Sequence, residues 1–136
     1  MYPYKLFISH SWAYTDAYEK LVNLLDKEPR FLYRDYSVPK DDPIHNAPNS
    51  KALADAIRNQ MVFCDVVIIL AGVYSTYSKW INEEIAIAQS FSKSKPILAI
   101  EPFASERTSV VVKQAADKVV SWNGSSIVAG IREITR

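Results

Sequence analysis

Glycine, cysteine and histidine are scarce in this chain, and each shortage excludes a class of site. Only three glycines, one cysteine and two histidines occur among the 136 residues. The turn expected after the first strand, residues 9–12, contains no glycine. A dinucleotide fold of the usual kind needs glycine there so that backbone amides reach the pyrophosphate. A Walker-type phosphate loop is absent as well, so both common phosphate-binding loops are excluded.

Metal and disulfide chemistry are equally poorly supported. The single cysteine, Cys64, has no second thiol to pair with and lies in an apolar run, so we interpret it as a small buried hydrophobic residue. The two histidines, His10 and His45, share no short ligand spacing with each other or with the thiol. We therefore expect no metal site. A Ser-His-Asp triad could be assembled only from residues scattered along the chain, so the sequence does not indicate one.

Neither sign of charge predominates, because 16 Lys and Arg balance 15 Asp and Glu for a formal net charge of +1. Charge-driven binding to nucleic acid or to an acidic membrane is therefore not expected. The longest apolar run, Val66 to Val73, is too short to cross a bilayer, and no signal peptide is visible. We predict one cytoplasmic globular domain over residues 1–136, which the content of 49% apolar and 23% charged residues fits.

Short β-branched runs alternate with amphipathic helical patterns along the chain. We expect strands at 5–9, 31–36, 65–71, 96–100 and 118–122, and helices at 13–27, 51–63, 78–92, 108–116 and 125–134. The aliphatic run at 65–71 is typical of a strand buried on both faces, whereas the polar 31–36 fits a sheet edge. Prolines with Asp and Asn predict a long loop over 37–49.

This alternation predicts an α/β fold with right-handed crossovers and a parallel sheet. We predict a flavodoxin-like three-layer sandwich, in which a five-stranded parallel sheet of order 2-1-3-4-5 carries helices on both faces. A ligand crevice then lies outside the carboxyl ends of strands one and three, between residues 9–12 and 72–80. A phosphorylatable receiver domain shares this strand order but requires acidic residues after strand one. This chain has Ser9-His10-Ser11 there, so we do not expect phosphorylation of that kind.

Two adjacent acidic residues of the helix at 78–92 differ in their expected surroundings. Glu84 shares a stripe with the apolar Trp80 and Phe91, whereas Glu83 aligns with Lys79 and should face water. Burying a carboxylate without a partner is unfavourable, so either a site holds Glu84 or its pKa rises. A carboxylate near the start of a helix also interacts favourably with the helix dipole, so a purely structural role for Glu84 stays open. The position of Glu84 beside the predicted crevice favours a functional role.

Three stretches of this chain resemble the signatures of one known domain family. Lys5-Leu6-Phe7-Ile8-Ser9-His10-Ser11 resembles the first strand of TIR and TIR-like domains, which ends in Phe-Ile-Ser. Residues 78–85, Ser-Lys-Trp-Ile-Asn-Glu-Glu-Ile, resemble its Ser-x-Trp-Cys-x-x-Glu-Leu motif, and alignment of the tryptophans puts the family's catalytic glutamate on Glu84. Pro96-Ile97-Leu98 resembles the strand that follows. The chain departs from the pattern at Ile81, which replaces the motif cysteine, and at 37–49, which lacks the glycine-bearing loop of adaptor TIRs.

The resemblance is closest to TIR-like proteins of the Thoeris antiphage system. It implies a bacterial enzyme that consumes NAD as substrate, needs no cofactor, and releases a cyclic ADP-ribose isomer that activates a partner effector. Self-assembly is a further implication. Glu84 would be catalytic and stabilise positive charge on the ribose. The other expected contacts are phosphate or ribose contacts from Ser9, His10 and Ser11, apolar walls from Phe7 and Trp80, and contributions from Tyr33 and Asp35 at the end of strand two.

Several of these residues have a second interpretation. His10 could be a loop histidine held by local hydrogen bonds, and Phe7 and Trp80 could be core residues. Two rival functions also stay open. One is a non-catalytic TIR-type interaction module, with the loop at 37–49 as its contact surface. The other is a nucleoside deoxyribosyltransferase-like enzyme, which shares the α/β layout and a catalytic glutamate.

Overall fold

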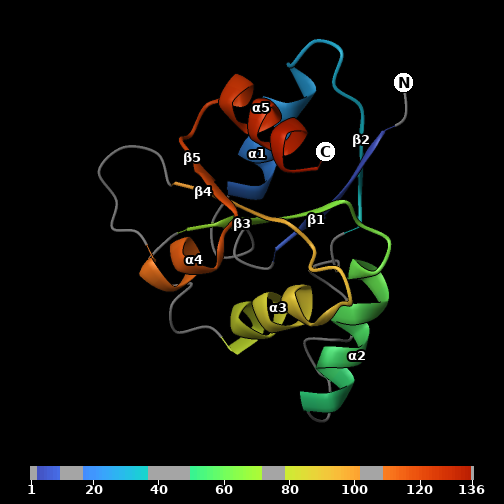
Figure 1. The fold of residues 1–136 in the computed structure, drawn as a ribbon. Helices are drawn as coiled ribbons and strands as arrows, with labels where there is room; N and C mark the ends of the chain where they lie inside the picture. Colours follow the sequence, from blue (N-terminus) through green and yellow to red (C-terminus); the bar gives the residue numbers. More distant parts are fainter. Residues whose placement is uncertain (1–2, 10–16, 37–49, 72–78, 102–108, 136) are drawn as a thin grey trace.

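A five-stranded parallel sheet forms the centre of the fold, in a computed structural model that describes residues 3–9, 17–36, 50–71, 79–101 and 109–135 (Figure 1). Its strands are β1 (Tyr4–Ile8), β2 (Tyr33–Asp35), β3 (Val66–Leu70), β4 (Ile97–Ile100) and β5 (Lys118–Val120). The order is β2-β1-β3-β4-β5, and every neighbouring pair is parallel. The predicted strand order is therefore confirmed. The polar β2 lies at an edge, as its composition indicates.

Helices cover both faces of this sheet and complete three layers. They are α1 (Ala17–Asp26), α2 (Ser50–Met61), α3 (Lys79–Ser90), α4 (Val110–Ala115) and α5 (Gly124–Ile134). Figure 1 shows α1 and α5 above the sheet and α2, α3 and α4 below it. The predicted flavodoxin-like sandwich is confirmed. None of the described helices is long and apolar enough to pass through a membrane.

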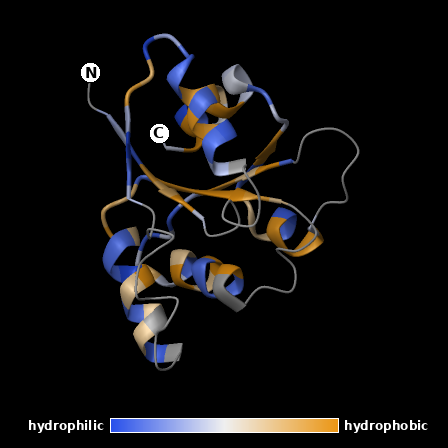
Figure 2. Cartoon of the chain, turned by 180° about the vertical axis from the view of Figure 1, so that it is seen from behind, coloured by the Kyte–Doolittle hydropathy of each residue, from blue (hydrophilic) through white to orange (hydrophobic). Residues whose placement is uncertain are grey.

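The sheet separates two apolar clusters, because side chains alternate between its faces. Leu6 and Ile8 of β1 pack in the cluster under α1 and α5, whereas Phe7 packs in the cluster with α2 and α3. All five residues of β3 are buried, as the aliphatic run predicts. Figure 2 shows the hydrophobic colour along the central strands and hydrophilic colour on outward parts of the helices. The same alternation directs Ser9, two residues after Phe7, toward the α2–α3 face.

The helix boundaries differ slightly from those expected. The helix predicted over 13–27 is α1, which ends at Asp26. In the turn that follows, the backbone of Arg30 has a left-handed conformation with a φ of 58°. Ser50, expected as a cap, is the first residue of α2. The helix predicted over 108–116 forms despite three consecutive valines. Its cap is Ser109, whose Oγ accepts a hydrogen bond from the backbone N of Val112 at 3.2 Å.

Cys64 is buried just before β3, with 3% of its surface exposed, which confirms its interpretation as a small core residue. Burial raises the pKa of its thiol to about 12 from the ordinary 9.0. The folded state therefore keeps a proton that the unfolded state loses above pH 9, so this thiol lowers stability as pH rises from about 9 to 12.

We predict that the free energy of unfolding of the wild type falls by about 2 kcal/mol more than that of Cys64→Ala between pH 8 and pH 10.5. Urea unfolding of both proteins across this range measures the difference, and tyrosines and lysines that titrate there affect both alike. Equal pH dependence in the two proteins would show that the thiol is not shielded from water.

Candidate functional site

A buried hydrogen bond joins the two segments that the sequence places at the crevice. The Oγ of Ser9 donates to Oε1 of Glu84 at 2.7 Å, across 75 positions of sequence. Only 3% of Ser9 and 1% of Glu84 are exposed. The expected juxtaposition of Glu84 with the end of the first strand is therefore confirmed.

Regular structure fixes both partners. Ser9 directly follows β1, and its backbone N donates to the carbonyl of Ile68 in β3 at 2.9 Å. Glu84 lies in the second turn of α3, which is packed on the core through the fully buried Ile81 and Ala88. The pair sits at the carboxyl ends of β1 and β3, where the strand order reverses. Ligands of open α/β sheets bind at such a switch point.

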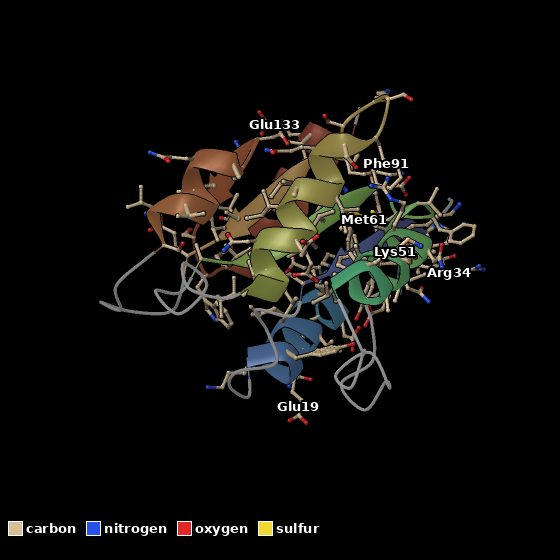
Figure 3. All side chains as sticks on the ribbon, turned by 90° about the horizontal axis from the view of Figure 1, so that it is seen from below. Glu19, Arg34, Lys51, Met61, Phe91 and Glu133 are labelled. Carbon is tan, nitrogen blue, oxygen red and sulfur yellow. The ribbon has the colours of Figure 1, made fainter. Side chains whose placement is uncertain are left out.

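The surroundings of the two adjacent acidic residues differ as the helical pattern predicts. Glu84 faces the sheet and is buried, whereas Glu83 is partly exposed. Figure 3 shows α3 lying across the face of the sheet beside α2, with Met61 at the end of α2 and Phe91 just beyond the end of α3. This face of α3 buries apolar side chains around one carboxylate. Such burial costs free energy unless the carboxylate is hydrogen-bonded, and buried carboxylates of this kind are frequent at functional sites.

A second serine at the same edge was missed by the sequence analysis. Among the described residues, the buried polar or charged side chains are Ser9, Glu84 and Ser109. The backbone N of Ser109 donates to the carbonyl of Ala71 at 2.9 Å, which places this serine at the carboxyl end of β3. A serine three residues before the buried Val112 is a helix-cap pattern that could have identified it. All three buried polar side chains therefore lie at the carboxyl-terminal ends of the strands.

Two predicted contacts of strand two lie on the other side of the sheet. The hydroxyl of Tyr33 donates to Oδ1 of Asp26 at 3.0 Å, and Asp35 accepts a hydrogen bond from the hydroxyl of Tyr18. Asp26 and Tyr18 both belong to α1, which covers the face opposite α3. Burial, and then the hydrogen bond to Asp26, raise the pKa of Tyr33 above its ordinary value. The structure thus joins Tyr33 and Asp35 to α1 and does not bring them to Glu84.

Phe7 is fully buried in the α2–α3 cluster, so the structure gives it the core role that its pattern left open. His10, Ser11, His45 and the loop at 37–49 lie outside the described residues. Trp80 belongs to the first turn of α3, one turn before Glu84, but its side chain is also outside the described part. Within that part, no three His, Cys, Asp or Glu side chains gather as metal ligands would.

A cavity of about 590 Å³ opens at the opposite, amino-terminal edge of the sheet, away from Glu84. The main polar side chains that line this cavity form hydrogen bonds to the protein backbone. Asp65 accepts from the backbone N of Lys5 at 2.9 Å, and Asp117 from that of Ile97 at 2.7 Å. Lys95 donates to two backbone carbonyls at 3.1 and 2.9 Å. These groups hold strand and helix ends together, so the cavity is not our candidate site. Its lining is Cys64, Asp65, residues 93–96, Asp117, Ile134 and Thr135.

The fold and the buried pair together define a flavodoxin-like α/β protein with a carboxylate at its switch point. The family described as the TIR-like domain of Thoeris protein ThsB matches residues 7–107, and the chain belongs to this family. The matched region includes Ser9 and Glu84 and ends before β5 and α5. The resemblance to TIR-like domains is thereby confirmed.

Two further comparisons add little. No curated protein matches the chain. A solved structure described as a prokaryotic SEFIR domain is 16% identical, with a TM-score of 0.49 over 97% of this chain and 96% of that one.

Proposed function

We propose that this protein is a TIR-like enzyme that cleaves the bond between nicotinamide and ribose in NAD, with Glu84 as its catalytic residue. The product would be closed into a cyclic ADP-ribose isomer that diffuses to an effector protein in the bacterial cytoplasm. The observation that carries the proposal is the buried carboxylate of Glu84, held at 2.7 Å by Ser9 at the switch point. Membership of the Thoeris TIR-like family supports it.

Cleavage of the nicotinamide–ribose bond requires little beyond one well-placed carboxylate. When the glycosidic bond breaks, its electron pair goes to the cationic nicotinamide ring, which leaves as a neutral molecule. Positive charge then develops on the ribose as an oxocarbenium-like species. A fixed carboxylate beside that sugar stabilises the charge, and more strongly in surroundings that exclude water. Neither a metal nor a second acid is needed for a leaving group of this quality.

The fate of the ribose cation depends on which nucleophile reaches it. A hydroxyl of the same molecule would form the new bond, release its proton to solvent and give a cyclic product. Water would instead give linear ADP-ribose. Exclusion of bulk water while the ribose is bound would favour the intramolecular reaction.

Product analysis tests the proposal. The purified protein is incubated with NAD in lysate from phage-infected cells, and nicotinamide and nucleotide products are identified by mass spectrometry. Uninfected lysate and infected lysate without the protein are the controls. We expect nicotinamide together with a product one water lighter than ADP-ribose. Failure of infected lysate to elicit any nicotinamide release would contradict the proposal. Release of bases from deoxynucleosides instead of NAD would identify a deoxyribosyltransferase.

A non-catalytic interaction module is the second candidate. Phe63, two residues after α2, is 59% exposed, and Val110, at the start of α4, is 62% exposed, so both apolar side chains are available to a partner. The same product analysis separates the two functions, because an interaction module leaves NAD intact whether or not it is assembled.

A further inference from the structure

We propose that Ser9 is a positioning residue, whose hydroxyl orients the carboxylate of Glu84 instead of donating to the phosphate of NAD. The inference rests on the proposed function, in which Glu84 is the catalytic group. It changes the role that the sequence indicates for Ser9, which is a direct contact with the substrate. Three features of the described residues support it: the direction of the hydrogen bond, the rigidity of the donor, and the length of the flexible side chain that carries the acceptor.

The direction of the hydrogen bond argues against a phosphate contact. A serine hydroxyl has one hydrogen, and here Ser9 donates it to Oε1 of Glu84. Phosphate oxygens only accept hydrogen bonds, so they would have to compete with the carboxylate for that hydrogen. The hydrogen of the hydroxyl is therefore committed to Glu84.

The donor is held rigidly by the sheet. The backbone N of Ser9 bonds to the carbonyl of Ile68 at 2.9 Å, which extends the β1–β3 pairing to this residue. Phe7, two positions earlier on the same face of the strand, is fully buried and anchors β1 against the α2–α3 cluster. The hydroxyl thus sits on an element that cannot shift without disturbing the core.

The backbone of α3 does not by itself determine how the carboxylate of Glu84 is oriented. Burial of Ile81 and Ala88 fixes the backbone of α3, but the carboxyl group of Glu84 is three side-chain torsions away from it. The last of these torsions has a broad energy minimum, so the plane of the carboxylate is weakly determined by the helix alone. The hydrogen bond from Ser9 to Oε1 restricts that plane. Stabilisation of a developing charge depends on such preorganisation.

The kinetic test compares Ser9→Ala with Ser90→Ala, which removes a serine hydroxyl at the far end of the same helix. Ser90 bonds only to Arg58 and to the carbonyl of Ile87 among the contacts described for it. We expect Ser9→Ala to lower kcat about 10- to 100-fold, the range set by a hydrogen bond to a charged group, with KM changed less than about 2-fold. Ser90→Ala should leave both constants unchanged. Ser9→Thr, which keeps the hydroxyl, should recover most of the activity.

Two outcomes would overturn the inference while leaving the proposed function intact. One is a rise in KM for NAD with kcat preserved, which would make Ser9 a substrate contact. The other is full activity in Ser9→Ala. Melting temperatures of all variants identify any loss that is due to unfolding.

A structural readout decides the inference even if the wild type does not turn over NAD. We expect a crystal structure of Ser9→Ala to show the Glu84 carboxylate rotated from its wild-type orientation, or in more than one. An unchanged orientation would show that the hydroxyl does not position it. Absence of turnover in the wild type, by contrast, counts against the proposed function alone.

Discussion

Replacing Glu84 by glutamine is expected to lower NAD turnover by about 1000-fold or more without weakening the fold. The amide keeps the size of the side chain and can still accept from Ser9, but it carries no charge to balance the ribose cation. Removing a charge from a position that is 1% exposed relieves a desolvation cost, so the melting temperature should stay at or above that of the wild type. Nicotinamide release and thermal unfolding measure the two effects.

Glu83→Gln is the matched control, since it makes the same change one residue earlier on the same helix. Glu83 is partly exposed, and we expect turnover to stay within about 2-fold of the wild type because a surface charge contributes little. If both variants lost activity equally, the effect would belong to the helix or to net charge and not to the buried carboxylate. Full activity in Glu84→Gln would remove the site assignment altogether.

Phe7→Ala is expected to produce the largest loss of stability, about 3 to 5 kcal/mol in the free energy of unfolding. Phe7 is fully buried in the cluster shared by β1, α2 and α3, so removing its ring leaves a cavity beneath the candidate site. A loss of that size is a large fraction of the roughly 5 to 15 kcal/mol that stabilises an ordinary domain. Urea unfolding measures the difference.

Phe63→Ala provides the comparison, because it removes the same ring from a position that is 59% exposed. Its ring stacks at 6.2 Å on Tyr36, and we expect a loss of about 1 kcal/mol or less. Phe7→Leu then separates core packing from substrate contact. It should cost less than about 1.5 kcal/mol and leave KM for NAD unchanged. A raised KM in a stably folded Phe7→Leu would show that the ring forms a wall of the pocket.

The sequence predicts the sheet well because its signals are strong and local. The continuous aliphatic run at 65–71 leaves a buried parallel strand as the simplest interpretation, and β3 is buried throughout. The helical period separates Glu84 from Glu83 because one position along a helix turns a side chain by about 100°. Both predictions depend only on spacing along one element.

The sequence predicts less well wherever two elements must meet. Tyr33 and Asp35 lie near the end of the strand predicted at 31–36, which suggests the crevice, but alternation along β2 turns both side chains toward α1. No sequence pattern shows which face of an edge strand is which until its pairing is known. The bond between Ser9 and Glu84 is similar, since 75 positions separate its partners and only the strand order brings them together.

The most direct test of the central claim is a crystal structure of Glu84→Gln with NAD bound. Our account predicts that the ribose attached to nicotinamide lies within hydrogen-bonding distance of the side chain at position 84, at the carboxyl ends of β1 and β3. NAD bound elsewhere, for example in the cavity beside Lys95 and Asp117 at the other edge of the sheet, would contradict it.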